Sequence, residues 1–293
     1  MPREQHPAER PHPDRPHTSV PASVLDLFAV PDDVRPLPGG QGHSVVAGDL
    51  VLSPGRDATT QAWLSPVLAR LAVALDTEQP RGVRIAMPIP ARDGSWVVDG
   101  WAASRYEPDT TACTDLGVLV ATARLLHARL AVAVPERPAG LDARTDRWAR
   151  ADRLVQRGGA ELRDTVAPYE SETVVQWVAE LDHAGRQGAP GPEQAQLVHG
   201  DLAGNVLLDA RGTPVVIDVA PYWWPAPWAE AVCVLDAVLW HGADPATLEP
   251  WQDAVRQGAL QRAALFRLLS EAPGSPVVAD LVRAVDSSPL RAL

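Results

Sequence analysis

Lysine is absent from this chain of 293 residues, so all 26 basic residues counted as Lys and Arg are arginines. Together with 29 prolines, this usage fits a GC-rich genome better than any functional demand. Cysteine is scarce as well. Cys113 and Cys233 both lie in apolar runs, which favours buried free thiols in a reducing cytoplasm over a disulfide.

Long apolar runs and a basic charge balance are also missing. No run of about eighteen apolar residues and no signal-peptide pattern occurs, so we expect a soluble, cytoplasmic protein that has no membrane partner. The net charge of −11 argues against nonspecific binding of nucleic acid, because such binding depends on basic surface. An acidic surface does not by itself identify a cationic substrate, since it also keeps proteins soluble.

The chain is long enough to bury substantial cores in one large domain or two lobes. Residues 1–20 carry Pro, Arg and His with almost no apolar content, so we expect a disordered tail. Turn residues and apolar spacing predict a short helix over 22–28, a strand over 49–53, a helix over 60–75 and a hairpin of strands 84–90 and 95–103. Helical spacing further predicts helices over 115–134, 144–156, 172–186, 226–241, 251–269 and 277–285.

The most informative segment is 197–218, with the sequence LVHGDLAGNVLLDARGTPVVID. The β-prone runs 206–208 and 215–217 flank a turn, and this hairpin folds the chain back so that Asp218 can approach Asn205. Phosphoryl transfer needs one carboxylate to orient the attacking hydroxyl, and an amide oxygen plus another carboxylate to hold Mg²⁺. We therefore predict that Asp201 is the catalytic base and that Asn205 and Asp218 bind Mg²⁺.

Chance is the competing interpretation, because Asp and Asn are common turn residues and a lone HGD tripeptide is a weak signal. The whole string is much rarer, and it resembles the catalytic and metal-binding segment of the aminoglycoside phosphotransferase-like kinases. GGQGHSV, WVVDGW, LDARTDRWARAD and PYWWPAPWAEAV resemble most closely an actinobacterial branch of that superfamily. The resemblance covers about residues 30–245.

This resemblance implies an α+β, bilobal protein-kinase-like fold with a small β-rich N-lobe, 21–105, and a larger, mainly helical C-lobe, 106–293. ATP with Mg²⁺ would bind between the lobes, and a small molecule with a hydroxyl would bind to the C-lobe. The nucleotide would contact a glycine-rich loop, which lets backbone N–H groups approach phosphates, and a hinge at about 103–107. The residues implied for the nucleotide are Gly39, Gly40, Gln41, Gly42, Ser53, Arg56, Arg105 and Tyr106.

The chain departs from the family pattern at three places. The loop between Asp201 and Asn205 is one residue shorter than usual, so we expect Asn205 to reach its metal by a different path. Ser53 stands where the family has the lysine that holds the α- and β-phosphates, and Pro66 stands near the position of its glutamate partner. Arg56 is the nearest cation and could substitute, although arginine is a poor isostere for lysine.

An acceptor pocket is the second functional interpretation, for the aromatic segment 221–228. Tyr222 and Trp223 are the best pocket candidates, because binding sites combine aromatic walls with a few polar groups. The alternative is that these aromatics pack the segment onto the C-lobe. Asp236 could bind the acceptor or cap a helix, and a structural role is favoured for His127.

The leading function is therefore a small-molecule kinase that transfers the γ-phosphate of ATP to a hydroxyl. Two alternatives remain open. One is a kinase-fold protein without kinase activity, because the lysine and glutamate are absent; the other is a different transfer chemistry, such as nucleotidyl transfer, that uses the same Asp/Asn/Asp set. Retention of the metal ligands favours retained chemistry.

Overall fold

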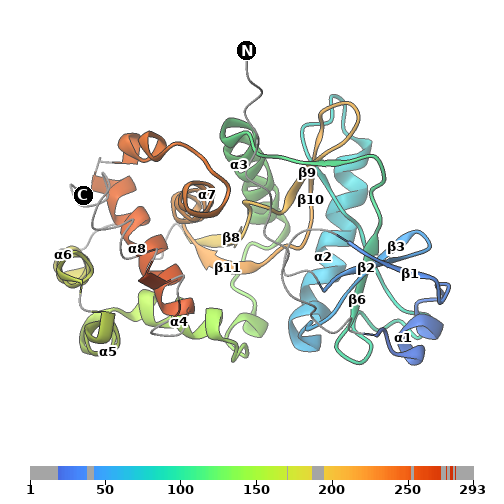
Figure 1. Cartoon of the computed structure of the whole chain (residues 1–293), viewed down its shortest axis with the longest axis horizontal. Coiled ribbons are helices and arrows are strands. Elements are labelled where there is room, and N and C mark those ends of the chain that lie inside the picture. Colours follow the sequence, from blue (N-terminus) through green and yellow to red (C-terminus); the bar gives the residue numbers. More distant parts are fainter. Residues whose placement is uncertain are drawn as a thin grey trace, which may run out of the picture.

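The computed structural model describes residues 19–37, 43–169, 171–186, 195–251 and 254–271, and four isolated positions beyond them (275, 278, 279 and 281). Nearly all of the predicted tail, the glycine-rich loop Gly39–Gly42 and most of the helix expected over 277–285 lie outside the described residues. Figure 1 shows a β-rich lobe at the right and a mainly helical lobe at the left, with α3, α7 and the strand pair β8–β11 between them.

The N-lobe is built on a five-stranded sheet in the order β1-β2-β3-β6-β5, in which all neighbours are antiparallel. Alternate side chains such as those of Leu50 and Leu52 enter a small core against helix α1, where Val24 and Phe28 are buried. The elements are α1 (Ala22–Leu27), β1 (Val34–Pro36), β2 (Val45–Ala47), β3 (Leu50–Ser53), β5 (Pro88–Ile89) and β6 (Ala102–Arg105).

Helix α2 (Ala58–Thr77) confirms the helix expected over 60–75 and begins earlier, because the Asp57 carboxylate caps it by accepting from the Thr60 N–H at 2.7 Å. Its apolar face, with Leu64 and Leu68, packs into a second core shared with the C-lobe. Pro66 lies inside this helix.

The strand expected over 84–90 is wrong as a single element. β4 (Arg84–Ile85) joins a different sheet from β5, where it pairs in parallel with β10 (Pro214–Val216). The chain changes sheets at this point because the Ala86 N–H donates to the Val216 carbonyl (2.9 Å), while the Met87 carbonyl accepts from the Arg105 N–H (2.8 Å). The second strand of that hairpin also starts later than expected, at Ala102.

The sheet that contains β4 has the order β4-β10-β9-β7 and carries the predicted hairpin. β9 (Val206–Leu208) pairs antiparallel with β10, with Leu207 opposite Val215, and β7 (Thr111–Ala112) pairs with β9. The predicted hairpin of 206–217 is thereby confirmed. β8 (Gln196–His199) precedes this hairpin in the sequence and β11 (Pro221–Trp224) follows it, and the two strands form a separate two-stranded antiparallel sheet.

Helices dominate the remainder of the C-lobe. α4 ends at Arg157. Gly158 and Gly159, which follow it, both have positive φ angles, and the chain turns there into α5, a helix that the sequence analysis did not predict. The helices are α3 (Leu116–Ala133), α4 (Arg147–Arg157), α5 (Gly159–Val166), α6 (Glu172–Arg186), α7 (Ala226–Trp240) and α8 (Ala254–Ser270). Short 3₁₀ segments occupy Ala139–Leu141, Ala167–Tyr169 and Pro245–Trp251.

The two cysteines and the most apolar long helix are both described by the structure. Cys113 and Cys233 are both buried free thiols, as predicted. Within the described residues, α3 is the one helix long and apolar enough to cross a membrane by length and composition. Its face that carries Leu119, Ala123 and Leu126 is packed in the second core.

Candidate active site

Asp201 lies on a tight turn that directly follows β8. Its side chain is 48% exposed, and its backbone N–H donates to Nδ1 of His199 at 3.2 Å. A side chain at the preceding residue would force the Tyr222 ring to move, because a Cβ on Gly200 would lie 2.4 Å from Cδ2 of Tyr222. The buried Tyr222 ring therefore fixes the path of the backbone that presents Asp201.

The shortened loop keeps Asn205 against Asp201. The Asn205 side-chain amide donates to the Asp201 carbonyl at 2.6 Å and lies 3.3 Å from its carboxylate Oδ2. Gly204 has a φ of +83°, which allows the chain to turn within three intervening residues. Because the amide N–H₂ faces Asp201, the amide oxygen of Asn205 is left to accept a cation.

Asp218 follows the hairpin and is brought next to this loop by its backbone. The Ile217 N–H donates to the Asn205 carbonyl at 2.9 Å, so Asn205 and the residue before Asp218 are hydrogen-bonded neighbours. Asp218 has a φ of +48°, an uncommon conformation for a residue other than glycine. The approach of Asp218 to Asn205 is the geometry that the sequence predicted.

Arg56 reaches Asp218 from the N-lobe. Nη1 of Arg56 donates to Oδ1 of Asp218, and the two side chains are 25% and 44% exposed. Burial raises the pKa of the Asp218 carboxyl, but the guanidinium of Arg56 outweighs this effect, so the pKa lies below its usual range. The Arg56 backbone is held in place because its N–H donates to the Gly100 carbonyl at 2.9 Å.

The rest of the N-lobe wall has no lysine–glutamate pair. Ser53 ends β3, and its Oγ lies 2.9 Å from Oγ of Ser44, so a hydroxyl pair occupies this end of the sheet. Helix α2 carries no carboxylate before Asp76. Arg56, which pairs with Asp218, is the cation that the sequence analysis offered as a substitute for the lysine.

The predicted hinge, about 103–107, includes the end of β6 at Arg105 and the two residues that follow it. Arg105 is exposed and Tyr106 half-buried, and the Tyr106 N–H donates to the Asp49 carbonyl at 2.8 Å. Arg84 braces the hinge by donating to both carboxylate oxygens of Glu107, at 2.8 and 3.2 Å, and to Asp76 of α2 at 2.9 Å.

Two buried histidines support the turn from behind. The His199 N–H donates to Nε2 of His127 at 3.1 Å, and Nδ1 of His199 accepts from the N–H groups of Asp201 and Ala220, at 3.2 and 3.3 Å. Burial lowers the pKa of His199 to about 4 and that of His127 to about 3, so both rings are neutral. This arrangement agrees with the structural role favoured for His127.

The acceptor candidates fall into two groups. Tyr222 is buried and packs against Trp228 and Phe266, with ring centroids 5.5 and 5.3 Å apart, whereas Trp223 is only partly buried. The position of Tyr222 matches the packing alternative, so Trp223 is the candidate in this segment whose side chain remains accessible.

Asp236 is 1% exposed and is bound by Arg267 of α8, so its carboxylate does not face a pocket. Arg267 also binds Asp201, at 2.6 Å, and was missed by the sequence analysis. Its one signal was a charged residue on an otherwise apolar helix face, ALFRLLS.

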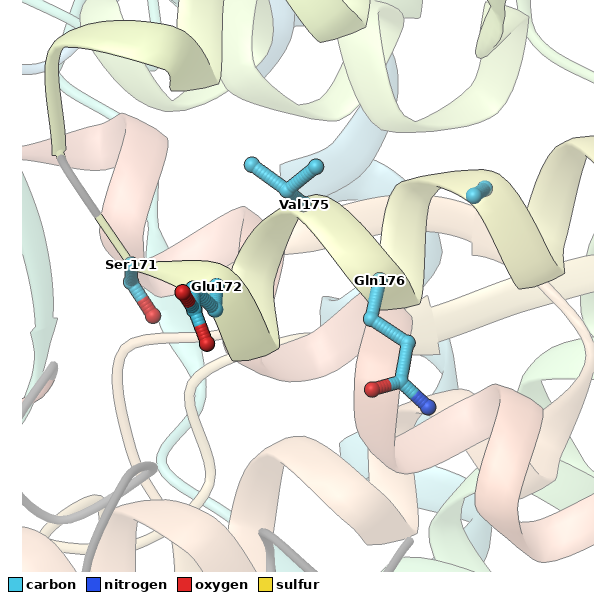
Figure 2. Close-up of a pocket in the computed structure, with 5 residues that line it drawn as sticks. Ser171, Glu172, Val175 and Gln176 are labelled. Carbon is cyan, nitrogen blue, oxygen red and sulfur yellow. The ribbon is translucent and has the colours of Figure 1, made fainter.

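A shallow hollow on the described surface lies away from these groups. It has a volume of about 370 Å³ and lies along α6, where Ser171, Glu172, Val175, Gln176 and Ala179 line it, as Figure 2 shows. None of the predicted site residues lines it.

No protein-family model matches the sequence, and no curated protein matches it significantly. Solved structures do match. An amicoumacin kinase in complex with AMP-PNP, Ca²⁺ and Ami is 16% identical, with a TM-score of 0.53, and the match covers 90% of this chain and 92% of that one. An aminoglycoside phosphotransferase from Alicyclobacillus acidocaldarius is 13% identical, with a TM-score of 0.51 and coverages of 93% and 92%. The chain therefore has the bilobal α+β fold of the aminoglycoside phosphotransferase-like kinases.

Proposed function

We propose that this protein is a phosphotransferase that moves the γ-phosphate of ATP to a hydroxyl of a small molecule. The observation that carries the proposal is the convergence of Asp201, Asn205 and Asp218 at one edge of the hairpin, with a guanidinium from the other lobe against Asp218. Two oxygen donors beside a separate, half-exposed carboxylate are the parts that phosphoryl transfer requires.

The donor set fits Mg²⁺. This ion binds through one or two protein carboxylates supplemented by phosphate oxygens and water, rather than in a cage made by the protein alone. Accordingly, no group of three or more His, Cys, Asp or Glu side chains within the described residues is placed to hold a metal. Arg56 is paired with Asp218, so Mg²⁺ would have to displace this guanidinium from the carboxylate. Bound Mg²⁺ would neutralise charge on the phosphates.

The residues of the chain then divide the remaining work. The oxygen of the acceptor hydroxyl bonds to the γ-phosphorus, and Asp201 accepts the proton of that hydroxyl. The bond between the γ-phosphorus and the β,γ-bridging oxygen breaks, which releases ADP. Asn205 and Asp218 hold the metal, and Arg56 takes the place of the family lysine toward the phosphates. Ser53, Arg105, Tyr106 and the loop Gly39–Gly42 are proposed to contact the nucleotide.

The acceptor is proposed to bind on the C-lobe side, where Trp223 is the accessible aromatic. The amicoumacin kinase with a similar fold was solved in complex with AMP-PNP, Ca²⁺ and Ami, which supports a nucleotide, a divalent cation and a small-molecule acceptor for this chain. The nucleotide is proposed to bind between lobes 21–105 and 106–293, and the buried free thiols are in keeping with a cytoplasmic enzyme.

A kinase-fold binding protein without activity is the second candidate. It is favoured by Ser53 and Pro66 at the lysine and glutamate positions, and by the ion pair that occupies Asp218. The two candidates differ in the consequence of nucleotide binding. An enzyme consumes ATP, whereas a binding protein only retains it.

Calorimetry with ATP, with and without Mg²⁺, followed by a coupled assay for ADP release, tests the proposal. We expect Mg²⁺ to tighten ATP binding by the wild type but not by Asp218→Asn, and we expect ADP release with at least one member of a panel of hydroxylated small molecules that includes amicoumacin. Asp209→Asn, in the exposed hairpin turn, is the matched control and should behave as wild type in the nucleotide measurement. Mg²⁺-dependent ATP binding without ADP release would support the protein without kinase activity, and no ATP binding would refute the phosphotransferase.

A further inference from the structure

Arg267 is a buried arginine that joins the predicted base to the interior of the C-lobe. It lies near the end of α8 and is 7% exposed. Its Nη2 donates to Oδ1 of Asp201 at 2.6 Å and lies 3.4 Å from the Gly200 carbonyl. One guanidinium thus contacts both the carboxylate and the backbone of the turn that presents Asp201.

The guanidinium is fixed from the opposite side by Asp236 of α7. Nε of Arg267 donates to Oδ1 of Asp236 at 2.8 Å, and Nη2 donates to Oδ2. The rings of Trp240 and Phe266 lie 5.4 and 5.2 Å from the guanidinium carbon. Two carboxylate bonds and two aromatic neighbours leave the planar guanidinium one orientation.

This arrangement differentiates the two oxygens of the Asp201 carboxylate. Oδ1 accepts from Arg267, whereas among the described residues the contact of Oδ2 is with the Asn205 amide at 3.3 Å. The side chain is nearly half exposed, so Oδ2 is the oxygen left to accept the acceptor hydroxyl. Without Arg267, rotation about the Cβ–Cγ bond would exchange the two oxygens.

Stability alone does not account for the Arg267–Asp236 pair. A buried ion pair costs desolvation that its attraction offsets only in part, and apolar residues of similar size often replace such a pair without loss of stability. The third contact, to the accessible Asp201, is the one that an apolar replacement could not supply.

We propose that Arg267, held by Asp236, is the positioning residue that orients the carboxylate of Asp201 toward the acceptor hydroxyl. This inference rests on the proposed function. Asp236 acts through Arg267 and does not contact the acceptor.

The test replaces both buried charges together, in Arg267→Met/Asp236→Leu, because Arg267→Met alone would leave Asp236 buried without a partner. Release of inorganic phosphate from Mg·ATP, with water as the acceptor, gives kcat and KM for ATP. We expect the double variant to fold, to keep KM within twofold, and to lose about 10- to 100-fold in kcat, the order of loss that misplacing a catalytic group causes. Arg267→Lys should recover part of this loss, because it restores a charge without the planar fork.

Arg262→Met is the matched control, since Arg262 is a partly buried arginine of the same helix whose bond, within the described part of the chain, goes to the Gly258 carbonyl of its own helix at 3.1 Å. It should leave kcat unchanged. A crystal structure of the double variant provides a readout that does not need turnover, and we expect more than one orientation of the Asp201 carboxylate.

The inference is overturned if the double variant keeps kcat within twofold of wild type, or if Asp201 retains a single orientation. If the wild type itself releases no phosphate and phosphorylates no acceptor, the proposed function fails. The crystal structure then still decides whether Arg267 orients Asp201.

Discussion

Replacing Arg56 with methionine is expected to weaken binding of a magnesium–nucleotide complex about tenfold, because Arg56 can contact either Asp218 or the phosphates. In the structure the guanidinium is bound to Asp218. If Mg²⁺ displaced it from Asp218, Arg56 would be free to contact the phosphates. The variant therefore loses the ion pair with Asp218 in the free protein and the contact with the phosphates in the complex.

The magnitude follows from the exposure of the pair. Arg56 and Asp218 are 25% and 44% exposed, and ion pairs with that access to water contribute only about 0.2–1 kcal/mol. A hydrogen bond from a cation to a phosphate is worth about 1.5–3 kcal/mol. The difference, roughly 1–2 kcal/mol, corresponds to about a tenfold change in affinity at about 1.4 kcal/mol per decade.

Calorimetry with Mg·AMP-PNP measures this change directly in wild type, Arg56→Met and Arg56→Lys. Adenosine is the ligand control, because it lacks phosphates and should bind all three proteins equally. Arg92→Met is the control variant, since Arg92 forms an exposed ion pair with Asp26 in the same lobe, at 3.7 Å. If Arg56→Met binds Mg·AMP-PNP as tightly as wild type or more tightly, Arg56 only neutralises Asp218 and does not contact phosphate.

Three further predictions concern the turn that carries Asp201. Asp201→Asn should reduce phosphate transfer by about 10²–10⁴-fold, the usual contribution of a general base, and should leave the calorimetric affinity for Mg·ATP within twofold. Gly200→Ala should lower the free energy of unfolding by about 1–3 kcal/mol in urea denaturation, since the added Cβ would overpack against Tyr222. Because His199 and His127 are neutral when folded, with pKa values of about 4 and about 3, the unfolded chain binds more protons below its histidine pKa of about 6.5. The contribution of these two histidines to the free energy of unfolding should therefore be fully present above about pH 6.5 and should be lost as the pH falls from there toward 4.

Each of these has an outcome that contradicts it. Transfer by Asp201→Asn within tenfold of wild type would exclude it as the base. For Gly200→Ala the comparison is Gly82→Ala, whose added Cβ would meet only the Leu125 side chain at 3.3 Å, and equal stabilities would show that Tyr222 does not constrain the turn. For the histidines, His127→Gln should flatten the loss of stability between pH 6.5 and 4; an unchanged slope would assign that loss to other groups.

The part of the site that could be predicted from sequence is the part that forms locally. The two β-prone runs and the turn between them determine the hairpin, and that hairpin alone brings Asn205 near Asp218. The spacing of apolar residues likewise located α2 and α3, because a buried helix face produces a periodic apolar pattern within one continuous stretch of sequence.

Contacts between distant segments were not predictable in this way. Arg56 and Asp218 are separated by 162 positions, and Arg267 is 66 positions from Asp201. Which carboxylate an arginine binds depends on how the lobes pack. The apolar periodicity of one helix predicts which of its own faces is buried, but not which residues of other elements it contacts. The same limit explains the strand expected over 84–90, where hydrogen bonds to Val216 and Arg105 divide one apolar run between two sheets.

The parallel pairing of β4 with β10 has a mechanical consequence for the metal ligand. β10 ends at Val216, two residues before Asp218, and its Val216 carbonyl is bonded to the N–H of Ala86. Asp218 is thus tethered to the N-terminal half of the chain through its backbone as well as through Arg56. A rotation of one lobe against the other would strain this ladder before it moved Asp218 away. Exchange of the Ala86 amide with solvent deuterium therefore reports directly on how far the two halves separate.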